Sequence, residues 1–246
     1  MKAMILAAGL GTRLRPLTND LPKALVEVAG RTLLEITLTR LETFGVNEVI
    51  VNTHHFADMI AEYLAANHNF GMSIELSREE ELLDTGGGLK KAAPFFVADS
   101  GQYGSFIVHN VDVISNIDLS AMARFHVDHG ALATLAVQNR ETSRYLLFDE
   151  EGQLCGRRVA NRPDELVRPA HSVQPLAFSG IHVISPLIFN AMKERGVFSI
   201  IDAYLRLAAH GEKIVAYNSD GAYWRDLGRP ESIAEAEQDL AAGKFS

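Results

Sequence analysis

The sequence is organised around Ala3–Lys23, AMILAAGLGTRLRPLTNDLPK, in which an apolar run leads directly into a glycine-rich segment. A continuous apolar run is typical of a strand covered on both faces, as in a parallel sheet flanked by helices. Gly9 and Gly11 permit a tight loop whose backbone N–H groups can face a polyphosphate. Arg13 and Lys23 add positive charge at the same place. The stretch therefore predicts a triphosphate-binding loop, and the alternative is a glycine-rich turn with solvated cations.

Two common nucleotide-binding motifs are absent from this segment. It lacks the Gly-Lys-Ser/Thr ending of a Walker A loop, and Leu14 stands where a dinucleotide-binding fingerprint requires its third glycine. The segment thus argues against an NAD-dependent oxidoreductase.

The first half of the chain alternates strands with helices. Apolar residues recur at helical spacing over 33–44, and Gly45 follows where a helix C-cap belongs. The other elements predicted in this half are strands at 48–52, 73–76 and 105–109 and a helix at 57–66. We therefore predict an α/β fold with a doubly wound, mostly parallel but mixed sheet flanked by helices.

The second half of the chain has a different order of predicted helices and strands. A helix is predicted at 119–129, followed by strands at 133–138 and 144–149 and a hairpin turn at 150–152, so some strands should be antiparallel. Residues 161–174 are polar, contain two prolines and show no period, which predicts a mobile loop. The last predicted elements are helices at 186–195 and 200–211, a strand at 213–218 and a helix from residue 230.

Length and composition narrow the class of protein. The chain has 246 residues, 47% of them hydrophobic, which predicts one domain spanning 1–246. A net charge of −8 with intermixed signs argues against a nucleic-acid partner. The single cysteine, Cys155, suits a reducing compartment, and no apolar run approaches the roughly 18 to 20 residues of a membrane span. We expect a cytoplasmic protein with no membrane partner.

The glycine-rich segment also carries a longer pattern. Gly-x-Gly-Thr-Arg at 9–13, Pro-Leu-Thr at 16–18 and Pro-Lys at 22–23 resemble the signature of the sugar-1-phosphate nucleotidyltransferases. The resemblance implies a Rossmann-like nucleotidyltransferase fold, with a nucleotide-binding half over about 1–118 and a sugar-phosphate-binding half over about 119–246. It implies a reaction between a nucleoside triphosphate and a sugar 1-phosphate that releases pyrophosphate and forms a nucleotide sugar. It assigns Arg13 and Lys23 to catalysis and to nucleotide binding, together with Ala7, Ala8, Gly9, Gly11 and Thr12.

A second glycine-rich segment covers residues 85–88, TGGG, at the start of a predicted helix. Three consecutive glycines weaken a helix start, and close approach of a base or ribose would explain them. The resemblance implies that Thr85, Gly86 and Gly87 hold the nucleotide base, whereas a plain turn is the alternative. Many uridine-specific relatives have a glutamine just before this loop, where this chain has Leu82. The sequence therefore specifies the base of the nucleotide substrate less well than it specifies the fold.

Two aspartates are candidate metal ligands. Asp112 follows the predicted strand at 105–109, at the carboxyl end where open α/β sheets bind ligands. Alone, Asp112 and Asp226 could each be cap or turn residues. The resemblance implies that together they hold Mg²⁺, which needs few carboxylates because water and phosphates complete its shell. Relatives have glycine where this chain has Val111, so the backbone here must avoid positive φ.

The resemblance further implies that Asn110, Ser179 and Gly180 bind the sugar phosphate, the last two from the strand Phe-Ser-Gly-Ile at 178–181. The alternative is that residues 178–181 form a buried strand with no role in ligand binding. His54-His55 and the acidic run 79–81 are set aside, because a histidine pair without a third ligand rarely binds metal and an acidic run is usually a solvated surface.

Within the family, the resemblance is greatest to the short bacterial N-acetylmuramate-1-phosphate uridylyltransferases of cell-wall recycling, which lack a C-terminal β-helix. It implies UTP and N-acetylmuramate 1-phosphate as substrates, supported by Ala8 at a position where guanine- and thymine-specific relatives often have glycine. We expect a monomer or a small homo-oligomer. The alternatives are a GTP-dependent mannose- or heptose-1-phosphate guanylyltransferase, a cytidylyltransferase, and a catalytically silent nucleotide-sugar-binding regulator. The presence of Arg13, Lys23, Asp112 and Asp226 argues against the silent protein.

Overall fold

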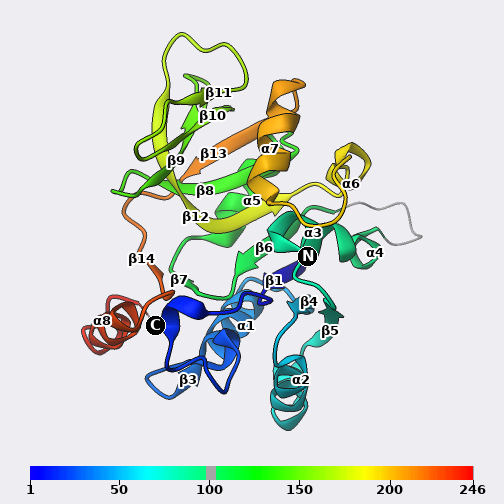
Figure 1. Cartoon of the computed structure of the whole chain (residues 1–246), viewed down its shortest axis with the longest axis vertical. Helices are drawn as coiled ribbons and strands as arrows, with labels where there is room; N and C mark the ends of the chain where they lie inside the picture. The colour runs from blue at the N-terminus through cyan, green and yellow to red at the C-terminus, as the bar shows by residue number, and fades with distance from the viewer. Residues whose placement is uncertain (98–103, 246) are drawn as a thin grey trace.

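A ten-stranded mixed sheet runs through the molecule in the order β11-β10-β9-β12-β6-β1-β4-β5 (Figure 1). Off this path, β8 pairs with β12, and β13 pairs with β8. The computed structural model describes residues 1–97 and 104–245. The strands of this sheet are β1 (Lys2–Leu6), β4 (Glu48–Thr53), β5 (Ser73–Arg78), β6 (Phe106–Asn110), β8 (Ala133–Gln138), β9 (Arg144–Phe148), β10 (Leu154–Val159), β11 (Glu165–Leu166), β12 (Gln174–Ile184) and β13 (Ile214–Asn218).

Smaller elements complete the fold. Two short sheets pair β2 (Glu27–Val28) with β3 (Arg31–Thr32), and β7 (Val113–Ser115) with β14 (Trp224–Asp226). The α-helices are α1 (Leu33–Thr43), α2 (Ala57–Ala66), α3 (Asp84–Lys91), α4 (Ala93–Phe96), α5 (Leu119–Asp128), α6 (Ile188–Ala191), α7 (Ile200–Ala209) and α8 (Pro230–Ala241). Three 3-10 turns are η1 (Thr12–Leu14), η2 (Lys23–Leu25) and η3 (His68–Gly71).

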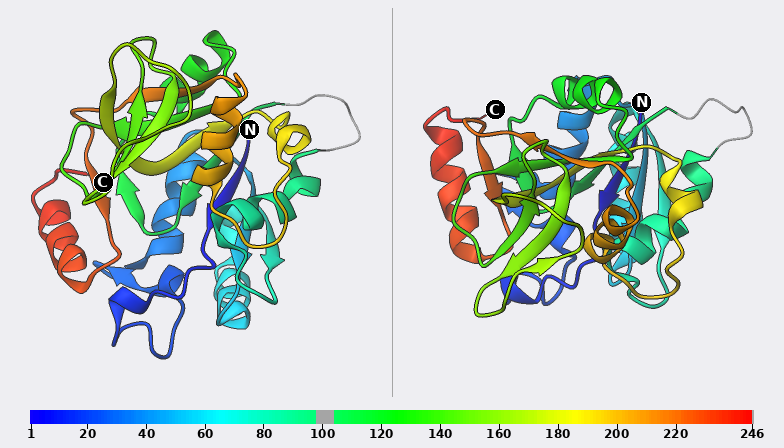
Figure 2. Two further views of the ribbon diagram at one scale, coloured as in Figure 1. Left: turned by 45° about the horizontal axis from the view of Figure 1, so that its top comes forward. Right: turned by 90° about the horizontal axis from the view of Figure 1, so that it is seen from above.

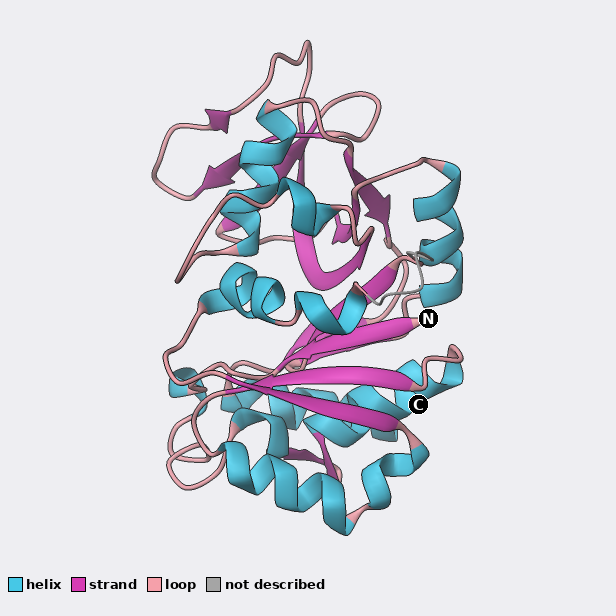
Figure 3. Ribbon diagram, turned by 90° about the vertical axis from the view of Figure 1, so that its right-hand side faces the viewer, coloured by secondary structure: helices cyan, strands magenta, loops and turns pink. Residues whose placement is uncertain are grey.

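Helices cover both faces of the first-half strands, which Figure 3 shows edge-on between two helical layers. Strand β1 alternates between them: Ala3 and Ile5 pack in one apolar cluster with α1, α2, α5 and α8, whereas Met4 packs in the other with α3, α4, α6 and α7. All three residues are fully buried. The predicted doubly wound, mostly parallel sheet is confirmed, because β1 pairs in parallel with both β4 and β6.

Strand β12 joins the two halves. It pairs antiparallel with β6 through residues 181–184 and with β9 through residues 174–176, and it curves strongly between them (Figure 3). Its pairing with β8 shifts register between Phe178 and His182. The antiparallel strands expected in the second half are therefore present. The segment 161–174 is largely loop, apart from the two residues of β11 and the first residue of β12.

The helix predicted at 186–195 is wrong in its length, since only Ile188–Ala191 is helical. Distant side chains take the carbonyl groups that the next helical turns would use. Lys90 donates to the carbonyl oxygen of Met192 at 3.0 Å and to that of Glu194 at 2.5 Å. Arg206 donates to the carbonyl oxygen of Ala191 at 3.0 Å. The chain therefore leaves the helix and runs toward α7 as a loop.

Two histidines lie in the core on neighbouring strands, His109 on β6 and His182 on β12. His109 donates from Nδ1 to the carbonyl oxygen of Asn110 at 2.8 Å, and Nδ1 of His182 lies 2.8 Å from the Tyr204 hydroxyl. Burial disfavours the charged imidazole and lowers the pKa of His109 to about 4 and that of His182 to about 3. Both are therefore neutral in the folded protein at neutral pH.

We expect the free energy of unfolding to fall as the pH drops from about 6.5 towards 4, because the unfolded chain protonates both histidines first. Each contributes up to about 1.4 kcal/mol per pH unit in that window. Urea unfolding at pH 7.5, 6.0 and 5.0 measures the slope. His182→Gln should reduce it, whereas His210→Gln, on the exposed surface, should not. Equal slopes for the wild type and His182→Gln would show that the folded protein already protonates His182.

Candidate active site

The glycine-rich segment after β1 folds into a compact loop. Gly11 has φ of 62°, and a Cβ there would lie 2.9 Å from Thr18, whose hydroxyl donates to the Gly11 carbonyl at 2.8 Å. A Cβ at Gly9 would meet no protein atom within 4 Å. Ala7, Ala8 and Gly9 line a cavity of about 340 Å³. Gly11 therefore shapes the loop, whereas Gly9 faces open space where a ligand can approach.

Lys23 and Asp112 meet in the same cavity. Lys23 begins η2, and its ammonium group forms an ion pair with the Asp112 carboxylate. Their side chains are only 11% and 16% exposed. Asp112 lies in the turn between β6 and β7, at the carboxyl end of a central strand. Val111 beside it is not among the residues with positive φ, in agreement with the sequence expectation.

Asp226 lies next to Asp112 on a paired strand. Strand β14 runs antiparallel to β7 with Asp226 opposite Val113, and the Leu227 N–H donates to the Asp112 carbonyl at 2.8 Å. A Cβ on Gly228 would lie 2.6 Å from both Arg13 Nη2 and Asp226 Oδ1. The two aspartates and Arg13 of the glycine-rich loop are thus brought together, and Gly228 leaves space for them.

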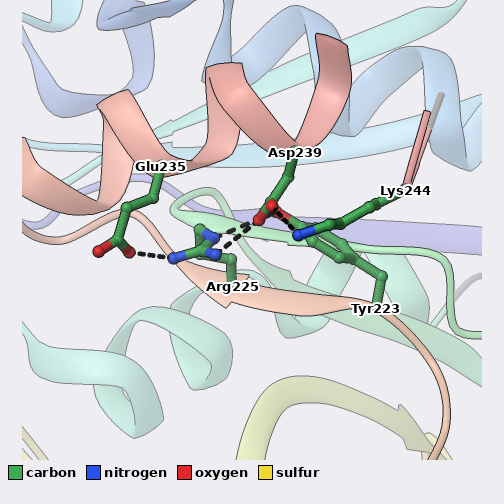
Figure 4. A network of polar contacts seen from close by, with 5 residues as sticks. All are labelled: Tyr223, Arg225, Glu235, Asp239 and Lys244. Carbon is green, nitrogen blue, oxygen red and sulfur yellow. Dashed lines mark hydrogen bonds and ion pairs between the residues drawn. The ribbon is translucent and has the colours of Figure 1, made fainter. Parts of the chain in front are cut away.

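A polar network fixes β14 to the C-terminal helix α8 (Figure 4). Arg225, directly before Asp226, pairs with Glu235 and, at 2.5 Å, with Asp239. Asp239 also accepts from Lys244 at 2.6 Å and from the Tyr223 hydroxyl at 3.0 Å. Hydrogen bonds from Lys244 and Arg225 lower the pKa of Asp239 to about 2, so the network stays charged at neutral pH.

Helix α8 also contacts the first half. The Ala29 N–H donates to Glu237 at 3.0 Å, and Figures 1 and 2 show α8 (red) beside the N-terminal loops (blue). The strand that carries Asp226 is therefore anchored to a helix that itself contacts the first half of the chain.

A second, larger cavity of about 1020 Å³ adjoins these residues. Arg13, Asn110 and Asp226 line it, and Asn110 also lines the smaller cavity. Ser179 and Gly180 contribute from β12. Gly180 has φ of 75°, and a Cβ there would lie 2.9 Å from the Asn110 amide nitrogen, which explains the glycine. The three residues expected to bind the sugar phosphate thus lie at one cavity.

The larger cavity is rich in arginine. Seven of the sixteen arginines line it, against three carboxylates and no lysine. The arginines are Arg13, Arg140, Arg144, Arg157, Arg158, Arg162 and Arg229. Arg157 pairs with Glu165 and Asp202, and Arg158 with Asp164. In a chain of net charge −8, this concentration of cations indicates an anionic ligand.

The triple-glycine segment starts α3, but the structure gives its glycines a different reason from close approach of a ligand. Both Gly86 and Gly87 donate to the Phe198 carbonyl, at 3.0 and 3.2 Å. A Cβ on Gly86 would lie 2.4 Å from the Phe198 ring, and one on Gly87 would lie 2.5 Å from the Gly196 carbonyl oxygen. Thr85 lines the smaller cavity, whereas Gly86 and Gly87 are buried behind it and line neither cavity.

The expectation that the acidic run 79–81 is a solvated surface is wrong for Glu79, which is 4% exposed. Glu79 accepts from the Asn52 amide at 2.8 Å and from the Leu83 N–H at 2.9 Å. Asn52 in turn accepts from the Ala7 N–H at 2.7 Å. A Cβ on Gly88 would lie 2.6 Å from Glu79, so the last glycine accommodates this carboxylate. Glu79 therefore connects, through Asn52, the start of the glycine-rich loop with the segment before α3.

Sequence reasoning missed Glu79 and Asn52, both of which line the smaller cavity. The available signal was position, because Glu79 directly follows β5 and Asn52 lies near the end of β4, at the same sheet edge as Asp112. His54 Nδ1 lies 2.9 Å from the Glu79 carbonyl oxygen.

Among the described residues, no three histidine, cysteine or acidic side chains are grouped to hold a metal. Over residues 1–97 and 104–245, no helix has both the length and the apolar character to cross a membrane.

The comparisons with known proteins agree with this geometry. The family model described as nucleotidyl transferase matches residues 2–243. The chain is 38% identical over 250 residues to N-acetylmuramate alpha-1-phosphate uridylyltransferase of Caulobacter vibrioides, covering 97% of this chain and 96% of the relative. It is 31% identical over 238 residues to the mannose-1-phosphate guanylyltransferase catalytic subunit beta of Xenopus tropicalis, covering 95% of this chain and 62% of that relative.

Solved structures show the same fold. HddC from Yersinia pseudotuberculosis, complexed with GMP-PN, superposes with a TM-score of 0.76 at 24% identity, covering 97% of this chain and 99% of that one. A UDP-glucose pyrophosphorylase complexed with UDP-glucose gives a TM-score of 0.77 at 19% identity, covering 98% of both chains.

Proposed function

The chain belongs to the nucleotidyl transferase family, and from that premise we propose that it transfers a uridylyl group from UTP to N-acetylmuramate 1-phosphate and releases pyrophosphate. The observation that carries the proposal is the meeting of Arg13, Lys23, Asp112 and Asp226 where two cavities adjoin. The smaller cavity begins at the phosphate loop and suits the nucleotide. The larger, arginine-rich cavity suits a phosphorylated sugar.

The residues present fit a magnesium ion. Asp226 lies on β14 opposite Val113, and Asp112 lies in the turn directly before Val113, so the two carboxylates are near each other. Mg²⁺ characteristically takes one or two carboxylates with substrate phosphates and water. When bound, Mg²⁺ neutralises the phosphate oxygens and favours attack at phosphorus. Lys23 pairs with Asp112 beside this position, so a lysine cation and a carboxylate both face the place proposed for the phosphates.

The proposed reaction is in-line attack by an oxygen of the sugar 1-phosphate on the α-phosphorus. The attacking oxygen is already anionic, so the chain needs neither a base nor a protein nucleophile. Lys23 and Arg13 stabilise the charge that moves to the leaving pyrophosphate. The phosphate loop at 7–13 holds the triphosphate, and Asn110, which lines both cavities, orients the two phosphates toward each other. Catalysis here is neutralisation and alignment of two polyanions.

The cavity chemistry favours the muramate acceptor over the alternative. Muramate is a sugar acid, so its 1-phosphate carries a carboxylate besides the phosphate, whereas mannose 1-phosphate has only the phosphate. Arg144 and Arg162 at the larger cavity have no acidic partner within 4 Å among the described residues. The surplus of arginines supports an acceptor with two anionic groups. The guanylyltransferase reading is supported by the 31% identity to a mannose-1-phosphate guanylyltransferase.

We propose that residues 1–246 form one domain, with a nucleotide half over about 1–118 and a sugar-phosphate half over about 119–246. The continuous sheet supports the single domain, because β12 of the second half pairs with β6 of the first. We also propose a cytoplasmic role in recycling cell-wall sugars, as a monomer or small homo-oligomer without nucleic-acid or membrane partners. The acidic net charge supports the lack of a nucleic-acid partner.

We expect UTP to be preferred over GTP in kcat/KM, and N-acetylmuramate 1-phosphate over mannose 1-phosphate. The reasons are Ala8 in the phosphate loop, the muramate-specific relative and the arginine-rich cavity. Pyrophosphate release across UTP, GTP, CTP and dTTP with a panel of sugar 1-phosphates measures both preferences. A tenfold or greater preference for GTP would move the assignment to the guanylyltransferases.

A further inference from the structure

Arg140 is a half-buried cation without a carboxylate partner within 4 Å among the described residues. It lies two residues beyond β8, and its guanidinium carbon is 3.6 Å from the centre of the Trp224 ring. Nη2 donates to the Phe178 carbonyl at 2.8 Å, and Nε is buried with no hydrogen-bond partner. Burial lowers the pKa of Arg140, against the opposing effect of the Asp226 charge. The Nε–H donor of Arg140 therefore has no partner among the described residues, although it is buried.

The surroundings hold the guanidinium in one place. The Trp224 indole N–H donates to the Ser179 carbonyl at 2.7 Å, which fixes the ring beneath Arg140. Trp224 and Asp226 are two residues apart on β14, so both side chains lie on the same face of the strand. Arg140 and Asp226 both line the larger cavity. A fixed, planar set of N–H donors therefore lies beside the proposed metal ligand.

Other arginines of the cavity differ from Arg140. Arg157 and Arg158 are neutralised by acidic side chains, and Arg144 and Arg162 are exposed, so water solvates them. A half-buried guanidinium without a counter-ion is unfavourable, and a phosphate satisfies it because the planar fork donates two parallel hydrogen bonds. Arg140 is thus the arginine of this cavity that a bound oxyanion would stabilise most.

We propose that Arg140, supported by Trp224, binds the phosphate of the acceptor sugar 1-phosphate and holds it beside Asp226. The inference rests on the proposed function. It adds a binding residue for the acceptor, distinct from Lys23 and Arg13, which act on the nucleotide. The acceptor phosphate would thereby lie next to Asp226, from where its oxygen can attack the α-phosphorus.

Steady-state kinetics of Arg140→Met and Arg140→Lys test this assignment. Loss of a charged bidentate contact should raise the KM for the sugar 1-phosphate roughly 30-fold in Arg140→Met, while the KM for UTP changes less than threefold. Lys keeps the charge but loses the planar fork, so Arg140→Lys should recover only part of the loss. Arg124→Met, which removes an exposed arginine of α5, is the matched control and should leave both KM values unchanged.

Kinetics with two acceptors distinguish whether Arg140 binds the phosphate or the carboxylate of the acceptor. N-acetylglucosamine 1-phosphate has the phosphate but lacks the carboxylate of N-acetylmuramate 1-phosphate. If Arg140 binds the phosphate, Arg140→Met raises the KM for both acceptors by similar factors. A rise confined to the muramate substrate would contradict the proposal and assign Arg140 to the carboxylate. If the wild type is active and Arg140→Met leaves the KM for both acceptors unchanged, the inference is overturned and the proposed function stays intact. Lack of pyrophosphate release by the wild type with every acceptor would refute the proposed function itself.

Trp224 is the only tryptophan of the chain and supplies a readout that does not depend on turnover. N-acetylglucosamine 1-phosphate is titrated with Mg²⁺ and a UTP analogue whose α–β bridge cannot be cleaved. In the wild type, the Trp224 emission should change to saturation. In Arg140→Met, the half-saturating concentration should rise roughly 30-fold, with nucleotide binding unchanged. No emission change in the wild type, or equal half-saturation in both proteins, would contradict binding at Arg140.

Discussion

Asp226→Asn is expected to abolish Mg²⁺-dependent transfer, and Asp112→Asn to do the same. Asp226 on β14 and Asp112 in the turn before β7 lie beside Arg13 and Lys23, where the phosphates of both substrates are proposed to converge. An asparagine is neutral and leaves a ligand set too weak to hold Mg²⁺ against the phosphates. Without the ion, the remaining carboxylate repels the triphosphate. Each single variant should therefore lose turnover by at least about 10³-fold, since the residues act as one unit.

The double variant should be little worse than either single one, because one loss already removes the metal. Activity against free Mg²⁺ concentration for the three variants measures this. Asp128→Asn, at the exposed end of α5, is the control for loss of a carboxylate. Asp226 also accepts from the Gly228 N–H at 2.7 Å, so it could serve only the turn. In that case Asp226→Asn would lower the melting temperature but keep a normal Mg²⁺ response, and Asp226 would be removed from the site.

Lys23→Ala is expected to lower turnover by roughly 10²- to 10³-fold, the scale seen when one preorganised charge stabiliser is lost. The lysine is largely buried, and its ammonium group lies at the cavity that begins with the phosphate loop. It is therefore positioned to bind phosphate rather than water. Melting temperature and turnover are measured together, because Lys23→Ala also removes the partner of Asp112. Lys193→Ala, which removes an exposed lysine, should leave turnover unchanged. A folded Lys23→Ala variant within threefold of wild-type turnover would show that the lysine has no catalytic role.

Local patterns predicted the fold well where burial and spacing agree. The apolar run that forms β1 is continuous because both faces of the strand are covered, so its neighbours could be predicted as a parallel sheet. The predicted helix at 33–44 is observed as α1, capped by the Thr32 hydroxyl, which accepts from the Glu35 N–H. The short α6 could not be predicted, since Lys90 and Arg206, from other helices, capture its carbonyl groups.

The residues of the candidate site likewise fall into those that the sequence predicted and those that it did not. The phosphate loop, Asp112 and Asp226 could be predicted because each lies in a contiguous motif, and their roles stay predictions. Glu79 was missed because its neighbours in the sequence are acidic and exposed, and only the fold buries it against Asn52. Arg140 was missed because its environment comes from three distant segments. The glycines at 86–88 carried a signal, but tertiary packing against Phe198, Gly196 and Glu79 explains them.

The proposed activity joins a nucleotide to a sugar 1-phosphate, and phosphorus NMR of a mixture of the protein, UTP, N-acetylmuramate 1-phosphate and Mg²⁺ detects that reaction. The sugar 1-phosphate resonance should decay while a nucleotide-sugar diphosphate and pyrophosphate appear in equal amounts. Added pyrophosphate should reverse the reaction, because the bonds broken and formed are of the same kind. Release of inorganic phosphate without a nucleotide sugar, or no change with this acceptor and every other sugar 1-phosphate, would show that the chain does not catalyse nucleotidyl transfer to a sugar 1-phosphate.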